Sequence, residues 1–284
     1  MKARWELLLL PSFLFSFLLL VTSQVIFLRS SLYRDLGFGR TGDEIQLANY
    51  IKFLGDPFYV EALWRTVHVS LLATVFTLLF GFPVAYMIAR MRSRWSMVLL
   101  AGIVVSAFVT IVIKVFGLHI MFSGNGFINQ TLLAVGLIDR PFTIIGNEAG
   151  VVVGLMHFTL GFGVVLLFSV VQTIPRSYEE AAEIHGASRW RVWRRVIIPL
   201  GLPGLVVGSL MLFNMCMGAF TSAALLGGGR VYTLPVLIQR VVIMEAKYSM
   251  GGTLAAVLLV SVVMINVLSV FLFMRLRSRR LVIT

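Results

Sequence analysis

The sequence predicts an all-α membrane protein with six transmembrane helices. Of its 284 residues, 59% are hydrophobic and 13% are charged, whereas about a quarter of the residues in a typical soluble domain are charged. The hydrophobic residues also gather in six long runs, and a helix needs about 20 apolar residues to cross the hydrocarbon core. A membrane β-barrel would instead need alternating segments of about ten residues. We therefore expect a single transmembrane domain built from helices.

The first apolar run follows Met1-Lys2-Ala3-Arg4, which resembles the start of a signal peptide. It is longer than the apolar region of about 7–15 residues found in signal peptides, and no small-residue cleavage site follows it. We therefore expect it to remain as the first span. The six predicted spans are 7–28, 66–89, 96–122, 149–172, 202–226 and 253–274.

Two features inside the spans concern helix shape and packing. Pro83 lies within the second span and predicts a kink there. Gly150 and Gly154, and likewise Gly204 and Gly208, have the four-residue spacing typical of closely packed membrane helices.

The connections predict the orientation of the chain. Lys and Arg are concentrated before the first span, after the second, between the fourth and fifth, and after the sixth. Basic connections face the cytoplasm, so both termini are expected there, in a bacterial inner membrane. The periplasmic side then receives a long loop, 29–62, and a short amphipathic helix at 127–137. We attribute the net charge of +12 to basic residues that set the orientation of the chain in the membrane. Nucleic-acid binding is not expected, because no recognition motif accompanies the charge.

Residues 173–199, the connection between the fourth and fifth spans, predict two short helices on the cytoplasmic side. Ser177 and Glu180 have the spacing of a capping box, in which each side chain binds a free backbone N–H of the other. The first helix should end near His185, where Gly186 suits a C-terminal cap with positive φ.

The second short helix is expected over Arg189–Val196, with Ser188 as its N-cap and Pro199 marking its end. Trp190 and Trp193 lie three residues apart and would form an aromatic ridge at the level of the lipid headgroups.

The same segment carries a specific motif. Glu180–Ala182, Gly186 three residues later, and Val196-x-Ile198-Pro199 after nine more resemble the EAA loop of ABC-importer permeases. The usual wording of that loop is EAA, three residues, Gly, nine residues and I-x-L-P, so Val196 and Ile198 are mild replacements. We refer to residues 173–199 as the EAA-type segment.

The resemblance extends through most of the chain. Lys114-Val115-Phe116-Gly117, Gly126–Asn129 and Leu226–Gly229 with Leu234-Pro235 are similar to stretches of spermidine/putrescine-type permeases. The long first periplasmic loop is typical of the first permease of those systems. In many relatives an Arg occupies the position of Lys114. The fold that this resemblance implies is the MetI-like permease fold with cytoplasmic coupling helices.

The resemblance also implies a set of partners. The chain would pair with a second, homologous permease and bind two ATPase subunits, with a periplasmic solute-binding protein delivering the cargo and lipid surrounding the spans. The sequence lacks a G-x-x-x-x-G-K-[ST] phosphate loop, so this subunit is expected not to be an enzyme, and ATP and Mg would be bound by the ATPase partner. The residues that the resemblance assigns to ATPase coupling are Glu180, Ala181, Ala182, Gly186, Ala187, Ser188 and Pro199.

Polar side chains inside spans are candidates for the translocation path. His157 lies near the middle of the fourth span, and Asn214 is similarly placed in the fifth. The alternative is interhelical hydrogen bonding worth about 1 kcal/mol, and the sequence does not separate the two interpretations. Lys114 and Arg65 lie near the outer face, where a long basic side chain reaches the headgroups. The candidate path residues are His157, Asn214, Met211, Met215, Lys114 and Phe116.

Only the resemblance indicates the cargo. Resemblance favours a polyamine, but the spans contain no acidic residue apart from Glu148 at the outer edge of the fourth. Sulfate-, iron-, aminophosphonate- or opine-type systems remain open. A proton-coupled secondary transporter would need titratable groups in series, and His157 alone gives little support. No catalytic set lies at one depth, and the single cysteine and the lack of a Cys/His cluster argue against a metal site.

Overall fold

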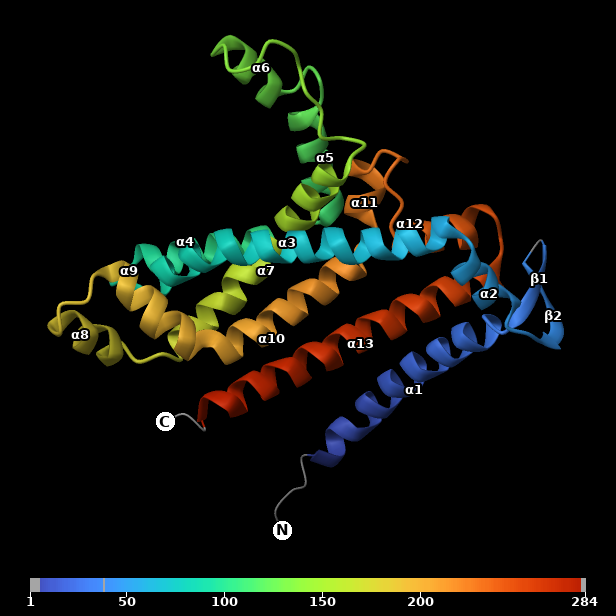
Figure 1. Ribbon diagram of the computed structural model, residues 1–284, viewed down its shortest axis with the longest axis horizontal. Coiled ribbons are helices and arrows are strands. Elements are labelled where there is room, and N and C mark those ends of the chain that lie inside the picture. The colour runs from blue at the N-terminus through green and yellow to red at the C-terminus, as the bar shows by residue number, and fades with distance from the viewer. Residues whose placement is uncertain (1–5, 38, 282–284) are drawn as a thin grey trace. The chain divides into compact units, whose positions relative to one another are not determined.

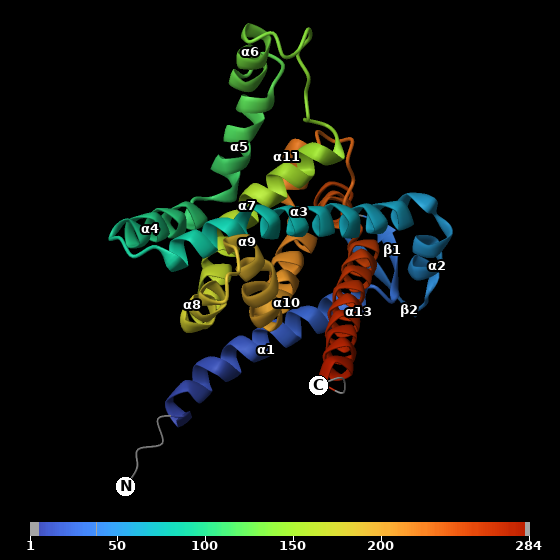
Figure 2. The ribbon, with the colours of Figure 1, turned by 60° about the vertical axis from the view of Figure 1, so that its left-hand side comes forward.

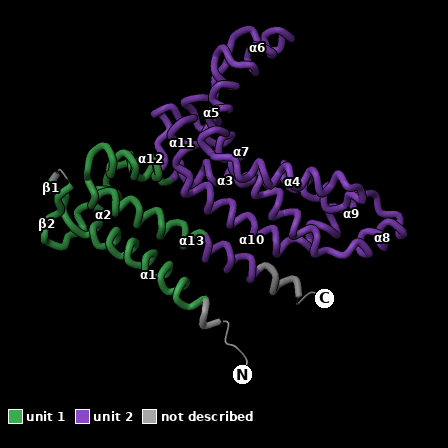
Figure 3. Tube along the Cα trace, turned by 180° about the vertical axis from the view of Figure 1, so that it is seen from behind, with its two compact units in different colours: residues 1–63, 234–265 green, residues 64–233, 266–284 purple. Residues whose placement is uncertain are grey.

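The computed structural model describes residues 6–37 and 39–281, and most of them are helical (Figures 1 and 2). The internal contacts of the chain divide it into two compact units (Figure 3). Unit 1 comprises residues 1–63 and 234–265, and unit 2 comprises residues 64–233 and 266–284. Two long helices, α3 and α13, contribute residues to both.

Unit 1 combines an N-terminal helix, a small hairpin and several short helical segments. Its elements are α1 (Glu6–Ser30), β1 (Tyr33–Gly37), β2 (Arg40–Ile45), α2 (Ala48–Gly55), the start of α3 (Pro57–Arg90), α12 (Leu234–Gln239), the π-helical turn η2 (Arg240–Met244) and most of α13 (Tyr248–Leu281).

The hairpin was not predicted, because its residues are mostly polar and lack the alternating pattern of a half-buried strand. β1 and β2 pair antiparallel, with Tyr33 opposite Ile45. Asp35 fixes the hairpin to the beginning of α13: its two carboxylate oxygens accept hydrogen bonds from the backbone N–H groups of Ser249 and Met250, each at 2.9 Å. A carboxylate at the first turn of a helix satisfies free N–H groups and opposes the helix dipole.

Unit 2 contains the helices around the EAA-type segment. Its elements are the rest of α3, α4 (Trp95–Phe108), α5 (Ile111–Phe122), α6 (Phe127–Ala134), α7 (Glu148–Gln172), α8 (Ser177–Ile184), α9 (Arg189–Val192), the π-helical turn η1 (Trp193–Ile197), α10 (Ile198–Met217), α11 (Thr221–Leu226) and the end of α13.

Six helical stretches of the described chain are long and apolar enough to cross a membrane, which confirms the predicted fold class. They are Leu9–Ser30, Pro57–Arg90, Ile111–Ala134, Glu148–Gln172, Arg189–Met217 and Tyr248–Arg275. The second begins earlier than the predicted 66–89, because Asp56 Oδ1 accepts a hydrogen bond from the N–H of Phe58 at 3.0 Å and so caps the helix at Pro57.

Two predicted spans are interrupted. The third, 96–122, divides into α4 and α5 because Val109 is extended and the side chain of Thr110 caps α5 by accepting from the N–H of Ile113. The fifth, 202–226, ends at Met217, and α11 follows after the break at Gly218. Both breaks lie inside apolar sequence, so hydropathy alone does not reveal them.

The paired glycines confirm the predicted close packing. A Cβ on Gly154 would lie 2.5 Å from Leu226 of α11, and one on Gly204 would lie 2.7 Å from Val170 of α7. A Cβ on Gly208 would overlap Leu166 of α7. At these positions α7 approaches α10 and α11 more closely than a larger residue permits.

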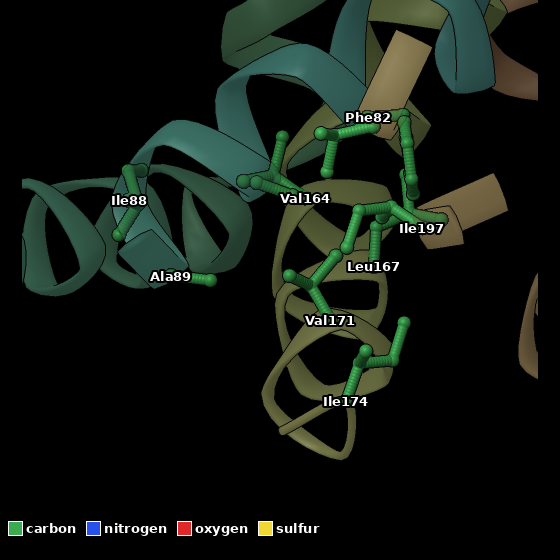
Figure 4. Packing of buried hydrophobic residues seen from close by; sticks show 10 residues of the cluster. Phe82, Ile88, Ala89, Val164, Leu167, Val171, Ile174 and Ile197 are labelled. Atoms are coloured by element: carbon green, nitrogen blue, oxygen red, sulfur yellow. The ribbon is translucent and has the colours of Figure 1, made fainter. Parts of the chain in front are cut away.

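The main apolar core of unit 2 lies where α3 and α7 end (Figure 4). It contains four residues of α3, three of α7, and three from the connection that follows: Phe82, Ala85, Ile88, Ala89, Val164, Leu167, Val171, Ile174, Val192 and Ile197. Ala182, Ala187 and Trp193 pack against it. The EAA-type segment is therefore anchored by the same core that holds α3 against α7.

Candidate functional site

The EAA-type segment folds as a helix, a turn and a second helix, as predicted. α8 ends at Ile184, and Gly186 adopts φ +78°, which confirms the predicted left-handed cap. The N–H of Gly186 donates to the carbonyl of Glu183 at 2.9 Å, and that of Ala187 donates to the carbonyl of Ala182 at 3.0 Å. A side chain at Gly186 would strain this turn, because residues with a Cβ rarely adopt that backbone conformation.

The predicted capping box is wrong. Arg176, not Ser177, occupies the N-cap position of α8, and no side chain caps it. The turn closes through the backbone instead: the N–H of Tyr178 donates to the carbonyl of Pro175, and the N–H of Glu179 donates to that of Arg176. Ser177 and Glu180 are therefore left exposed.

Pro199 does not end the second helix, contrary to the prediction. α9 passes into η1 and then into α10, and Pro199 lies in the first turn of α10. A proline lacks an N–H, and the wider turns of a π-helix accommodate irregular backbone bonding. Ser188 occupies the N-cap of α9 as predicted, but its side chain makes no cap hydrogen bond.

Glu179, the residue before the motif glutamate, makes the strongest polar contacts of the segment. Its Oε1 lies 2.6 Å from Nε of Arg90, with the two side chains only 12% and 15% exposed. Its Oε2 accepts a hydrogen bond of 2.7 Å from the hydroxyl of Tyr86. We call Tyr86, Arg90 and Glu179 the Glu179 cluster; it joins the last turns of α3 to the first turn of α8.

Two backbone contacts reinforce this junction. The Arg90 guanidinium also donates to the carbonyl of Ile174 at 3.0 Å. Arg176 donates to the carbonyl of Ala89 at 3.3 Å, so each side of the junction binds the other. These carbonyls lie at or near the C-terminal ends of α7 and α3, where helix carbonyls lack intrahelical partners.

Sequence reasoning missed the Glu179 cluster. Arg90 was counted only among the basic residues that indicate the orientation of the chain, and Glu179 was given no role. The one available signal is a basic residue in the last turn of one helix and an acidic residue in the first turn of another, and that pattern also arises from helix dipoles alone.

An open pocket of about 500 Å³ lies beside the Glu179 cluster. Its lining is mostly charged, with acidic side chains from α8 and basic ones from the ends of the neighbouring helices: Tyr86, Met87, Arg90, Met91, Arg92, Arg176, Glu179, Glu180, Glu183, Arg189 and Val192. Two large apolar side chains of the segment are exposed, Ile184 at 84% and Trp190 at 65%.

Of the residues assigned to ATPase coupling, most are exposed. Glu180, Ala181, Gly186, Ser188 and Pro199 face outward. Ala182 and Ala187 are half-buried and pack on the apolar core instead.

The candidate path residues separate into groups. Asn214 forms a reciprocal amide pair with Asn266 of α13, at 2.9 and 3.2 Å, which supports the interhelical interpretation for that residue. His157 of α7 is half-buried and lies within electrostatic range of Lys114 of α5.

The remaining path candidates differ in exposure. Lys114 is 9% exposed, whereas Phe116 and Met211 are 52% and 55% exposed, and Met215 is half-buried. Lys114 therefore lies inside the unit rather than extending to the surface, which corrects the expectation that it reaches the headgroups.

Arg65 and Glu148 form an ion pair at the start of α7. Nε of Arg65 lies 3.0 Å from Oε1 of Glu148, and Nδ1 of His68 lies 3.3 Å from Oε2. Glu148, at the outer edge of the fourth predicted span, is thus bound within the chain, which supports a structural role for Arg65.

Unit 1 has a second group of charges, at the turn before α13. Oε2 of Glu245 lies 2.8 Å from Nζ of Lys247, and Oε1 lies 3.5 Å from Nε of Arg240. Hydrogen bonding to Lys247 lowers the pKa of Glu245, and the same bond raises the pKa of Lys247. We call these three residues the Glu245 cluster. They lie beside an open pocket of about 490 Å³ that Asp35, Glu245 and Lys247 help to line.

Six apolar spans with a structured loop between the fourth and fifth are typical of a multi-span membrane protein. The family described as "Binding-protein-dependent transport system inner membrane component" matches residues 66–282. The chain belongs to this family, and it is a permease subunit of an ABC importer.

Relatives of known name agree with this assignment. The chain is 28% identical over 239 residues to the spermidine/putrescine transport system permease protein PotB of Haemophilus influenzae, covering 84% of this chain and 83% of the relative. It is 35% identical over 184 residues to PotB of Salmonella typhimurium, covering 65% and 64%. It is also 31% identical over 206 residues to the molybdenum transport system permease protein ModB of Mycobacterium tuberculosis, covering 71% and 76%.

Solved structures share the fold. A chain of a bacterial ABC transporter that imports the acidic polysaccharide alginate matches with a TM-score of 0.79 and 18% identity, covering 96% of each chain. A chain of the inward-facing methionine transporter MetNI matches with a TM-score of 0.59 and 19% identity, covering 75% of this chain and 93% of that one. The predicted MetI-like fold is confirmed.

Proposed function

We propose that this permease subunit forms half of the translocation path for a polyamine. The observation that carries the proposal is the similarity to PotB proteins, at 28% identity over 84% of the chain and 35% over 65%. The second half of the path would come from a homologous permease.

The proposed orientation places both termini and the EAA-type segment in the cytoplasm of a bacterium. Lys and Arg concentrate at that end of the spans, which is the pattern of cytoplasmic connections. The hairpin of unit 1 and helix α6 would then face the periplasm, where a solute-binding protein docks.

The EAA-type segment is proposed to bind the ATPase through its exposed face. Glu180, Ala181 and Gly186 are exposed, with the apolar side chain of Ile184 beside them. ATP and Mg would be bound by that partner, because this chain has no phosphate loop. Gly186→Val should weaken binding of the ATPase, since valine at φ +78° distorts the turn.

Uptake by the reconstituted transporter tests the cargo. Proteoliposomes containing the permease pair, the ATPase and the binding protein are given labelled spermidine, and uptake requires enclosed ATP. The proposal is supported if unlabelled putrescine reduces the uptake of labelled spermidine and molybdate does not. Uptake of molybdate or another anion in place of spermidine contradicts it, and leaves the sulfate-, iron-, aminophosphonate- or opine-type alternatives.

The class of machine has its own test. A permease of this kind should co-purify with an ATPase whose hydrolysis increases when the loaded binding protein is added. ATP-independent uptake driven by a proton gradient would instead indicate a secondary transporter.

A further inference from the structure

We propose that the Glu179 cluster is a strut that carries the movement of the EAA-type segment directly into α3. The inference rests on the proposed function, in which an ATPase moves that segment. The residues before and after the segment, α7 and α10, are connected to it by the chain itself, and they would move with it in any case. The Glu179 cluster adds a third span that sequence does not connect to the segment.

The contacts have the geometry of a rigid connection. One carboxylate, that of Glu179, uses both oxygens to bind α3: Oε1 binds Arg90 at 2.6 Å and Oε2 binds Tyr86 at 2.7 Å. Tyr86 and Arg90 lie one helical turn apart, so the carboxylate grips α3 at two points on one face. Two points of attachment restrict rotation as well as separation.

Two further hydrogen bonds reinforce the attachment of α8 to α3. Arg90 also binds the carbonyl of Ile174, and Arg176 binds the carbonyl of Ala89. Beneath these polar contacts, Phe82, Ala85 and Ile88 of α3 share an apolar core with Val192 and Ile197 of the second half of the segment (Figure 4). Packed side chains and close, largely buried ion pairs of this kind transmit displacement, because neither deforms continuously.

The position of the cluster within α8 separates two tasks. Glu179 is half-buried and binds Tyr86 and Arg90 of α3. The neighbouring residues Glu180 and Ile184 are exposed, and Ile184 is 84% exposed. One face of α8 is thus available to a partner while an adjacent face is attached to α3. A force applied to the exposed face reaches α3 through a single short helix.

Substitution of Glu179 provides the first test. In the complete transporter, Glu179→Gln keeps the size of the side chain and one acceptor oxygen but removes the charge that binds Arg90. We expect the number of solute molecules moved per ATP hydrolysed to fall below that of the wild type, because movement of α8 then reaches α3 less completely. Arg92→Gln is the matched control, because Arg92 lines the same pocket, is exposed and lies outside the EAA-type segment; its transport per ATP should equal that of the wild type. Equal transport per ATP in Glu179→Gln and wild type overturns the inference.

Restoring the pair separates a strut from a residue needed for folding. The double variant Arg90→Glu with Glu179→Arg replaces the ion pair in the reverse direction. Recovery of transport per ATP above that of either single variant supports the strut. A double variant no better than the worse single variant, with the complex assembled, contradicts it.

A cross-link tests the inference without altering the cluster. Met87→Cys on α3 and Glu183→Cys on α8 both line the pocket and are exposed, and a flexible bismaleimide can join them. Native Cys216 is 2% exposed and should not react. If α3 and α8 move as one body, the cross-linked transporter keeps its transport, like each single-cysteine variant treated with the reagent. Loss of transport only after cross-linking shows that the two helices must separate, and overturns the inference.

Stimulation of ATP hydrolysis in the wild-type complex separates a failure of the proposed function from a failure of the strut alone. If the loaded binding protein fails to stimulate ATP hydrolysis by the wild-type complex, the proposed function is wrong. If stimulation occurs and Glu179→Gln shows normal transport per ATP, only the strut is wrong.

Discussion

The Glu179 cluster and the Glu245 cluster each contain a glutamate paired with an arginine, in different settings. In each, two neighbouring side chains contact a glutamate; both contacts are shorter than 3 Å in the Glu179 cluster, and one is in the Glu245 cluster. The side chains of Arg90 and Glu179 are 15% and 12% exposed, whereas those of Lys247 and Glu245 are 50% and 33% exposed. Water therefore screens the second pair much more than the first.

The clusters also differ in what they connect. Tyr86 and Glu179 are 93 residues apart in the sequence, while Lys247 and Glu245 are two residues apart. Ordering the local pair costs little chain entropy but joins nothing that the backbone does not already join. The comparison teaches that an ion pair acts as a structural connection only where it is both buried and long-range.

The largest expected effect comes from Arg90→Ala. Removing one partner of a buried pair leaves the other charge uncompensated and costs about 3–5 kcal/mol; since this pair retains some exposure, we expect the lower end, about 3 kcal/mol. Equilibrium unfolding of the purified subunit in mixed detergent micelles measures the change. Arg92→Ala is the control, because Arg92 lines the same pocket and is exposed. A loss in Arg90→Ala no greater than in Arg92→Ala would remove the distinction between the clusters.

Tyr86→Phe is expected to have the next largest effect. It deletes the hydroxyl that donates to Glu179 at 2.7 Å and leaves the ring in place. A hydrogen bond to a charged group contributes about 1.5–3 kcal/mol, and the same unfolding measurement should show a loss in that range. Tyr178→Phe removes a hydroxyl from an exposed ring, 53% accessible on α8, and should change stability little. Equal effects of the two substitutions would mean that the tyrosine contributes nothing to the cluster.

The sequence predicted those features that depend on local pattern. Long apolar runs identified the six spans, because a membrane helix must be apolar along its whole length. Gly186 was predicted with positive φ because that backbone conformation favours glycine, and it was found at +78°. The glycine pairs predicted close packing for the same kind of local reason.

Helix breaks, cap geometry and long-range contacts were not predictable from hydropathy and motif spacing. The breaks at Val109 and Gly218 lie in apolar sequence. The capping box at Ser177 matched its pattern and still did not form, since backbone bonds at Pro175 and Arg176 close that turn. Glu179 was passed over in favour of Glu180, because nothing near it in the sequence reveals that Arg90 and Tyr86 lie opposite.

Asp35→Ala tests an intermediate case, a half-buried carboxylate with long-range contacts and no basic partner in its hydrogen bonds to Ser249 and Met250. It removes the group that caps α13, and lost caps cost about 0.5–2 kcal/mol. Hydrogen exchange at the N–H groups of Ser249 and Met250 should also increase, since both lose their acceptor. Asp43→Ala, in the exposed part of strand β2, is the control and should leave exchange at those two groups unchanged. If exchange does not change in Asp35→Ala either, the hairpin is not fixed by this carboxylate.

Lys247→Ala should have the smallest effect, about 0–1 kcal/mol, because exposed ion pairs contribute little. The way in which this loss of stability changes with pH and salt is more informative than its size. The lowered pKa of Glu245 means that its contribution is present above the ordinary glutamate pKa, about 4.3, and is lost as pH falls through the lower folded value. The raised pKa of Lys247 means that its contribution is present below the ordinary lysine pKa, about 10.4, and is lost as pH rises through the folded value.

The difference between wild type and Lys247→Ala should therefore be greatest at neutral pH and low salt. It should shrink in acid, in strong base and at about 1 M salt, where the Debye length is about 3 Å. Thermal unfolding of the two proteins across this grid measures the difference. The loss caused by Arg90→Ala should change much less with salt, because the Glu179 cluster is shielded from mobile ions. If salt reduces both losses equally, the two glutamates occupy equivalent electrostatic environments, and burial does not account for the connection between α3 and α8.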